Sequence, residues 1–222
     1  MGKDTPVFTV CPSCGAWSPD KQVEAAGGID AVAICRDCGA RIPFHRLPLF
    51  VVTGPSGAGK SALALALPRL LPECVVLDND VLWGAVAASP DDNFRSYHAV
   101  WLRLVIDIHQ SGRPVVLSGT ITPEQLEGSI ERRYLASIHY LALTCDDPVL
   151  VERLKARPDW RGAGGDAFVA RMVAFNSWLR IHATQTSPPM TVLDTTDVPL
   201  DTTAGEVAAW VRRHLRQHRA GG

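Results

Sequence analysis

The stretch Gly54-Pro55-Ser56-Gly57-Ala58-Gly59-Lys60-Ser61 decides the fold of this chain. An apolar run, residues 47–53, precedes it, and an alternating Leu/Ala segment, residues 62–67, follows it. The stretch fits the pattern G-x-x-x-x-G-K-[ST] in the strand, loop and helix context that gives this pattern its meaning. Its glycines let the backbone turn tightly and aim successive N–H groups at one point, where the helix adds its positive end. The sequence therefore predicts a phosphate-binding loop, called the phosphate loop below.

Each residue of the phosphate loop has an expected role. Lys60 is expected to reach the β- and γ-phosphates of a nucleotide as a point charge, and the Ser61 hydroxyl to be a direct magnesium ligand. The alternative, a Gly-rich turn with a chance Lys-Ser, is disfavoured by the flanking segments. The predicted nucleotide-binding residues of the loop are Gly54, Ser56, Gly57, Ala58, Gly59, Lys60 and Ser61.

Length and composition narrow the class of protein. The chain has 222 residues, of which 46% are apolar, which favours one main domain with a small appendage. Its 22 basic and 23 acidic residues balance, so no overall field favours nucleic acid or an anionic membrane. No apolar run approaches ~20 residues, and the N-terminus lacks the layout of a signal peptide. We expect a cytoplasmic protein with no membrane contact.

The cysteines near the N-terminus form two similar knuckles, Cys11-Pro12-Ser13-Cys14-Gly15 and Cys35-Arg36-Asp37-Cys38-Gly39, with 20 residues between Cys14 and Cys35. Four thiolates at this spacing are typical of a closed tetrahedral zinc site. Both knuckles resemble those of a zinc ribbon. We therefore predict that Cys11, Cys14, Cys35 and Cys38 bind Zn²⁺ in a ribbon domain that, with its linker, spans residues 1–46. Residues 42–48 are predicted to be the linker.

The role of the ribbon has two interpretations. A short segment cannot bury enough surface to fold alone, so the metal is expected to supply most of its folding energy. The favoured role is a structural clip on the main domain, and the alternative is contact with a partner protein. Nucleic acid is disfavoured because the basic residues of the segment are scattered and Trp17 stands alone.

From residue 47 to the C-terminus, apolar runs alternate with longer helical patterns, which is typical of a parallel sheet covered by helices. Cys74 and Cys145 fall at the ends of such runs, where a thiol is usually a small buried apolar group. The predicted strands are residues 49–53, 74–78, 114–118, 139–145 and 190–194.

The second of these strands ends in Asp78-Asn79-Asp80. In open α/β sheets the carboxyl ends of the strands border the ligand crevice, so both carboxylates are expected near the phosphates. Strand, phosphate loop, helix, strand and D-x-D together resemble the P-loop small-molecule kinases of the nucleoside-monophosphate-kinase class, especially shikimate kinase. The resemblance implies that Asp78 helps to hold magnesium and that Asp80 is the base for the phosphoryl acceptor. The alternative is that Asp78 only caps a helix that begins near Asp80.

The same resemblance implies the fold and the surroundings of the acceptor. The expected fold is α/β, a three-layer P-loop NTPase fold with a five-stranded parallel sheet in the order 2-3-1-4-5, over residues 47–222, plus the small N-terminal zinc ribbon with its four cysteines. Residues 81–113 are predicted to form two helical stretches around the polar break at residues 89–93. Gly119, after the third strand, is expected to permit close approach of the acceptor, while Ser118 and Thr120 are either site or turn residues. Residues 91–127 also resemble the ATP-binding tunicamycin-resistance proteins.

Arginines at 153, 157 and 161 lead into a Gly-rich segment, residues 162–165. This arrangement resembles the lid of the same kinase class, around residues 157–166, where guanidinium groups stabilise the charge of the transferring phosphoryl group. The resemblance implies that Arg153 lies beside the adenine and that Arg157 or Arg161 reaches phosphate. The alternative is an exposed basic helix with a flexible turn.

Together these patterns favour an ATP- and Mg²⁺-dependent phosphotransferase whose catalytic residues are Lys60, Asp80, Arg157 and Arg161. The expected acceptor is a small hydroxylated or phosphorylated metabolite, such as a nucleoside, nucleotide, sugar or antibiotic. Two other functions fit the same motifs. One is a nucleotide-binding resistance protein that sequesters its ligand, and the other is an adaptor that senses ATP.

Overall fold

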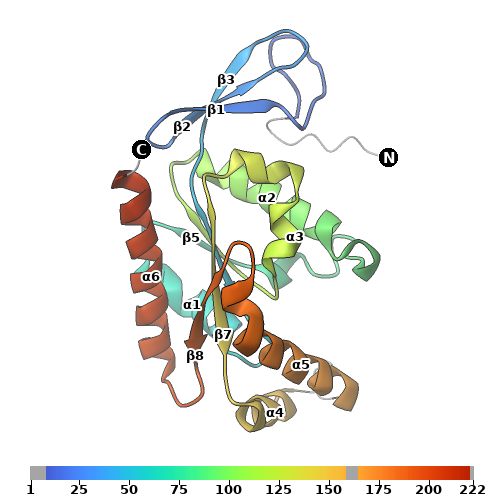
Figure 1. Cartoon of the computed structure of the whole chain (residues 1–222), viewed down its shortest axis with the longest axis vertical. Helices are drawn as coiled ribbons and strands as arrows, with labels where there is room; N and C mark the ends of the chain where they lie inside the picture. The colour runs from blue at the N-terminus through green and yellow to red at the C-terminus, as the bar shows by residue number, and fades with distance from the viewer. Residues whose placement is uncertain (1–8, 159–164, 221–222) are drawn as a thin grey trace.

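Two β-sheets organise the chain (Figure 1). The structure is a computed structural model that describes residues 9–158 and 165–220. Near the N-terminus, three strands form an antiparallel sheet in the order β1-β2-β3. Their bounds are β1 (Gln22–Gly27), β2 (Asp30–Ile34) and β3 (Arg41–His45).

The larger sheet has five parallel strands in the order β5-β6-β4-β7-β8. Counted from the strand that leads into the phosphate loop, this order is 2-3-1-4-5. Both the order and the five strands are confirmed, the strands to within one residue at each end. Their bounds are β4 (Leu49–Thr53), β5 (Val75–Asp78), β6 (Val115–Ser118), β7 (Ile138–Thr144) and β8 (Met190–Asp194).

Helices cover both faces of the large sheet and give three layers (Figure 1). One face packs on α1 (Lys60–Leu70) and α6 (Leu200–Ala220). The other packs on α2 (Arg95–His109), α3 (Pro123–Glu127) and α5 (Asp166–His182). The remaining elements are α4 (Asp147–Lys155) and the 3-10 turns η1 (Asn79–Leu82), η2 (Pro90–Asp92), η3 (Ile130–Tyr134) and η5 (Ala183–Gln185).

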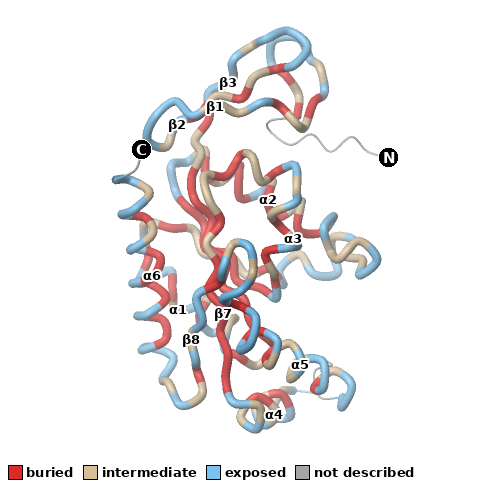
Figure 2. Tube along the Cα trace, viewed as in Figure 1, coloured by how far each residue is buried: buried red, intermediate tan, exposed pale blue. Residues whose placement is uncertain are grey.

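The central strand β4 explains why the sequence shows an unbroken apolar run at this point. All five of its residues are buried, as Figure 2 shows for the middle of the sheet. Leu49 and Val51 pack toward α2 and α5, whereas Phe50 and Val52 pack toward α1 and α6. A strand that is buried on both faces needs apolar residues at every position. None of the helices in the described part of the chain combines the length and apolarity needed to cross a membrane.

The prediction of a linker at residues 42–48 is wrong for residues 42–45. Residues 41–45 form β3, whose Phe44 pairs with Ala31 of β2 and is 5% exposed. Pro43 made this segment resemble a linker, but β3 is an edge strand of the small sheet, where a residue without an N–H is tolerated. The first of the two helical stretches predicted within residues 81–113 is also absent, because the described chain has only η1, a turn and η2 before α2.

The ribbon packs directly on the main domain. Tyr134 donates its hydroxyl hydrogen to the Pro19 carbonyl oxygen over 2.8 Å, and its ring meets Phe44 edge-on at 5.8 Å. Arg133 donates to the carbonyl oxygen of Asp20 over 2.7 Å. Ala31, Ala33 and Phe44 join the hydrophobic core of α2 and β4. The ribbon and the main domain therefore share a core.

The shared core lies at the start of β4, and the phosphate loop follows its end. Because β4 has five residues, the two sites lie at opposite ends of a strand roughly 16 Å long. Figure 1 shows the small sheet and α4 at opposite ends of the molecule. The ribbon therefore lies away from the phosphate loop, and contact with a partner protein stays an alternative to the structural role.

A buried histidine gives a testable link between the core and pH. His109, the last residue of α2, is fully buried, and both ring nitrogens lack a hydrogen-bond partner among the described residues. Burial lowers its pKa to about 3. A folded-state pKa below the unfolded value of about 6.5 means that stability is fully present above pH ~6.5 and is lost as pH falls.

We expect His109→Leu to unfold at least as late in urea as the wild type at pH 7.5, because no hydrogen bond is lost. Between pH 6.5 and 5 the wild type should lose about 1.4 kcal/mol of its unfolding free energy per pH unit through His109, and the variant should not. His98 and His139, whose pKa values burial lowers to about 4, remain in both proteins. Urea unfolding at pH 7.5 and 5.5 measures the difference. Equal acid sensitivity in the two proteins would show that His109 does not charge on unfolding.

Candidate active site

The phosphate loop joins β4 to α1, and its lysine lies over the loop. Lys60, the first residue of α1, donates from Nζ to the carbonyl oxygens of Gly54 at 2.7 Å and Pro55 at 3.0 Å. Gly57 has φ 94°, and a Cβ there would lie 2.9 Å from Cδ1 of Leu150 in α4. A side chain at position 57 would be strained at this positive φ and would crowd Leu150 and Leu154 of α4, which explains the glycine.

The end of β6 and the residues that follow it support the phosphate loop. Ser118 donates its hydroxyl hydrogen to the Lys60 carbonyl oxygen over 3.4 Å, and Thr120 donates to that of Gly54 over 3.2 Å. Thr53 accepts a hydrogen bond from the Ile121 N–H. The sequence left the roles of Ser118 and Thr120 open, and both now prove to support the loop.

Two carboxylates, Asp78 at the end of β5 and Asp80 in the turn that follows, act on Lys60. Burial lowers the pKa of Lys60 to about 8, the charges of Asp80 and Asp78 counter this fall, and the charge of Arg157 adds to it. The two aspartates act on Lys60 because β4 and β5, which lead to the phosphate loop and to the D-x-D turn, end at the same edge of the parallel sheet. Asp78 also caps η1, since its Oδ1 accepts from the Asp80 N–H at 3.0 Å. Asp78 thus caps this turn, as the alternative interpretation expected, through Oδ1 of its carboxylate.

Asn79, between the two aspartates, fixes their turn to the sheet. Its carbonyl oxygen accepts a hydrogen bond from the Tyr97 hydroxyl, and its side chain is buried against Gly119. A Cβ on Gly119 would lie 2.6 Å from Cβ of Asn79. The prediction that Gly119 makes room for the acceptor is wrong, because Asn79 occupies that space.

A cleft of about 260 Å³ opens on one side of the phosphate loop. Arg153 of α4 lines it and donates from Nη2 to the carbonyl oxygens of Thr195 at 3.0 Å and Thr196 at 2.9 Å. Arg153 therefore joins α4 to the loop after β8. The lining residues are Gly57, Ala58, Gly59, Ala62, Leu63, Arg153, Thr195, Val198, Leu200 and Thr203.

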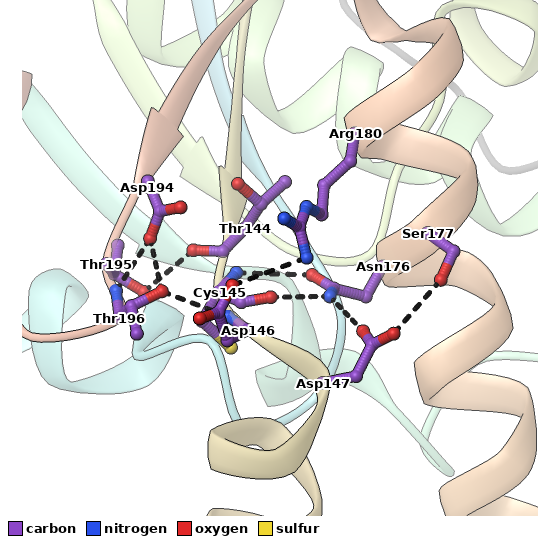
Figure 3. Close-up of polar contacts among 10 residues, drawn as sticks. All are labelled: Thr144, Cys145, Asp146, Asp147, Asn176, Ser177, Arg180, Asp194, Thr195 and Thr196. Atoms are coloured by element: carbon purple, nitrogen blue, oxygen red, sulfur yellow. Dashed lines mark hydrogen bonds and ion pairs between the residues drawn. The ribbon is translucent and has the colours of Figure 1, made fainter.

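Figure 3 shows the hydrogen bonds that hold the wall of this cleft. Thr195 donates to the Thr144 carbonyl oxygen through both its N–H and its hydroxyl, so the ends of β7 and β8 are joined. Asn176 of α5 is fully buried and donates from Nδ2 to the Cys145 carbonyl oxygen and to Asp147. Thr195, which lines the cleft, is therefore fixed to the end of β7, and α5 is attached to the start of α4.

The predicted lid lies partly outside the described residues. Arg157 follows α4, and its charge lowers the pKa of Lys60. Its contact with phosphate stays a prediction. Arg161, together with the rest of residues 159–164, is outside the described part of the chain. Its role stays a prediction.

The four ribbon cysteines come together as the spacing predicted. Their sulfur atoms all lie within 4.8 Å of one another, with 3.7 Å between Cys11 and Cys38 and 3.8 Å between Cys14 and Cys35. In a tetrahedral site with Zn–S bonds of about 2.3 Å, sulfurs are about 3.8 Å apart. The donor set and its dimensions fit a metal of the zinc type.

The sequence profile of a family described as an AAA domain matches residues 51–165, more than half of the chain. The chain belongs to this AAA domain family. The match begins inside β4 and includes the phosphate loop, Asp78, Asp80 and Arg153. A search of curated protein sequences gives no significant match.

Solved structures show the same fold. A gluconokinase from Sinorhizobium meliloti superposes with a TM-score of 0.56 at 18% identity, covering 77% of this chain and 94% of that one. A tunicamycin resistance protein from Deinococcus radiodurans gives 0.55 at 21%, covering 75% and 96%. Shikimate kinase from Acinetobacter baumannii gives 0.51 at 18%, covering 76% and 94%. The expected three-layer P-loop NTPase fold is therefore confirmed for this AAA-domain chain.

Two residues near the site, Trp83 and Asn176, were not assigned a role from the sequence. Trp83 lies one turn after Asp80 and contacts Tyr97 and Phe94 with its ring. Asn176 was singled out only weakly, although its amide joins three segments. An aromatic three residues after the D-x-D motif was the available signal for Trp83.

Proposed function

We propose that the chain is an ATP- and Mg²⁺-dependent phosphotransferase that acts on the hydroxyl group of a small metabolite. The observation that carries this proposal is the gathering of Lys60, Asp78 and Asp80 at the carboxyl ends of β4 and β5. A phosphate-binding lysine beside two carboxylates supplies both a place for the donor and a base for an acceptor. The fold of known kinases supports the same function.

The donor is expected to lie along the phosphate loop, with its base in the 260 Å³ cleft. Backbone N–H groups of residues 56–61 and the start of α1 would hold the phosphates. Lys60, which lies on the carbonyl oxygens of Gly54 and Pro55, would turn to the β- and γ-phosphates. Arg153 would flank the base and Arg157 the γ-phosphate.

The hydroxyl and carboxylate oxygens of Ser61 and Asp78 fit Mg²⁺, which prefers oxygen ligands. When bound, this ion neutralises charge on the β- and γ-phosphates. Asp80 accepts the proton of the acceptor hydroxyl as its oxygen bonds to the γ-phosphorus. The bond from that phosphorus to the β,γ-bridging oxygen breaks, and ADP leaves. Lys60 and Arg157 stabilise the charge that spreads over the γ-phosphoryl oxygens.

The test is ADP release by the zinc-loaded full chain across a panel of hydroxylated compounds. A phosphotransferase releases ADP faster when its acceptor is added, and mass spectrometry then detects a product heavier by one phosphoryl group. A protein that binds ATP and a panel compound but never releases ADP would instead be a sequestering protein. A protein that binds ATP but neither binds a panel compound nor releases ADP would instead be an adaptor that senses ATP.

A further inference from the structure

The segment that joins β5 to α2, residues 79–94, follows the first carboxylate of the site directly. It is mostly apolar outside η1 and η2, and residues 85–88 are Ala-Val-Ala-Ala. Val81 is 73% exposed and Trp83 is 59% exposed, within three residues of Asp80. The Trp83 N–H donates to the Asp80 carbonyl oxygen at 3.0 Å, so the ring and the carboxylate belong to one turn. Large apolar side chains are therefore open to solvent beside the proposed base.

The rings of three residues pack together and form what we call the aromatic wall, namely Trp83, Phe94 and Tyr97. Trp83 is its most exposed member. Its ring centroid lies 5.7 Å from that of Tyr97, edge-on, and 6.1 Å from that of Phe94. Tyr97 is 1% exposed, and its hydroxyl is bonded to Asn79, so the wall is anchored to the turn that carries Asp78 and Asp80. The exposed side of Trp83 is thus held in place, at a fixed position relative to the carboxylates.

The backbone at Phe94 adds an independent observation. Asn93 has φ 53° and Phe94 has φ 58°, and the left-handed region is rare for an aromatic residue. Gln125 of α3 holds this corner, since its Nε2 donates to both the carbonyl oxygen and Oδ1 of Asn93. Strained residues of this kind persist where the surrounding structure holds them, often at ligand sites. The Phe94 ring that follows this corner is the one that lies 6.1 Å from the Trp83 ring.

Charge in this segment opposes an anionic ligand. Residues 79–95 contain Asp80, Asp91 and Asp92 against a single cation, Arg95. Arg103, farther along α2, is paired with Glu131 at 2.9 Å. A carboxylate or phosphate on the acceptor would meet repulsion from these aspartates. An uncharged or cationic group would not.

We propose that the acceptor is a neutral or cationic hydroxylated compound with a flat apolar ring, which lies against Trp83 of the aromatic wall while its hydroxyl faces Asp80. This inference rests on the proposed phosphotransfer and narrows it, because it excludes phosphorylated and acidic acceptors.

The test uses three probes that share one ring and differ in charge, namely benzyl alcohol, benzylamine and benzoate. Ligand-observed NMR titrations with the zinc-loaded full chain, with and without the magnesium complex of a non-hydrolysable ATP analogue, measure their binding. Benzyl alcohol and benzylamine should bind more tightly than benzoate. Trp83→Ala should weaken both about tenfold, the cost of one aromatic contact and its buried area. Trp83→Phe should restore binding to within about twofold.

Arg95→Ala is the matched control, because Arg95 would be the natural partner of an acidic acceptor. It should leave the binding of the neutral and cationic probes unchanged. Benzoate as the tightest probe, binding that Trp83→Ala does not change, or no binding of any probe would each overturn the proposed ligand class.

Failure of this inference is distinguishable from failure of the phosphotransfer. Acceptor-dependent ADP release with carboxylated or phosphorylated compounds would overturn the ligand class and leave the phosphotransfer intact. The opposite outcome is also possible to recognise. If the neutral probes bind in a Trp83-dependent way but no hydroxylated ring compound stimulates ADP release, the phosphotransfer is overturned and the ligand class stands.

Discussion

Asp80→Asn should slow acceptor-dependent ADP release by ~10²-fold or more, while ATP affinity stays nearly the same. An amide has the shape of a carboxylate but cannot take the proton of an acceptor hydroxyl. The turn should keep its geometry, because the Asp80 N–H, which bonds to Asp78, is unchanged. Steady-state ADP release and calorimetric ATP binding, measured on the same preparation, separate the two effects.

Glu206→Gln is the control for loss of a carboxylate. Glu206 is exposed on α6 and lies outside the proposed site. It should leave ADP release unchanged. If Asp80→Asn also turns over at the wild-type rate, Asp80 is not the base.

Removal of the ribbon metal should destabilise the whole protein. Structural zinc supplies the folding energy of small ribbons, so Cys35→Ser or a strong chelator should unfold residues 9–45. That loss would expose Phe44, Ala31 and Ala33, which now complete the core beside α2. We expect a cost of about 3–5 kcal/mol to the main domain and a Tm lower by roughly 10 °C. Thermal unfolding followed by circular dichroism, with metal content measured in parallel, gives both numbers.

Cys74→Ala is the control for loss of a thiol. Cys74 is buried in the core between α1 and α6, away from the ribbon, so this variant should keep its metal. A metal-free wild type that melts at the same temperature as the loaded protein would show that the ribbon is only an appendage.

Much of the fold could be predicted from residues that act locally. Three motifs predict their local structure without any information from distant residues. They are the apolar run of β4, the glycines of the phosphate loop and the two cysteine knuckles. Gly15 and Gly39 both have φ 71°, and each donates its N–H to the carbonyl oxygen of the first cysteine of its knuckle. The strand order, by contrast, came from resemblance, because no residue pattern encodes which strands are neighbours.

The errors arose where distant residues decide the structure. β3 depends on pairing with β2 and on Tyr134, which is 90 residues farther along the chain than Phe44. Gly119 was assigned to the acceptor because its neighbour in space, Asn79, could not be known. The aromatic wall needs Gln125 to hold the corner at residue 93, and no spacing rule connects the two segments.

Nucleotide binding by the phosphate loop is the central claim, and calorimetry with ATP and Mg²⁺ on the folded, metal-loaded chain tests it most directly. We predict saturable binding at one site, weakened about 10- to 100-fold in Lys60→Ala by loss of the charged contact to phosphate. Absence of binding to ATP and GTP, or equal affinity in Lys60→Ala, would contradict this account.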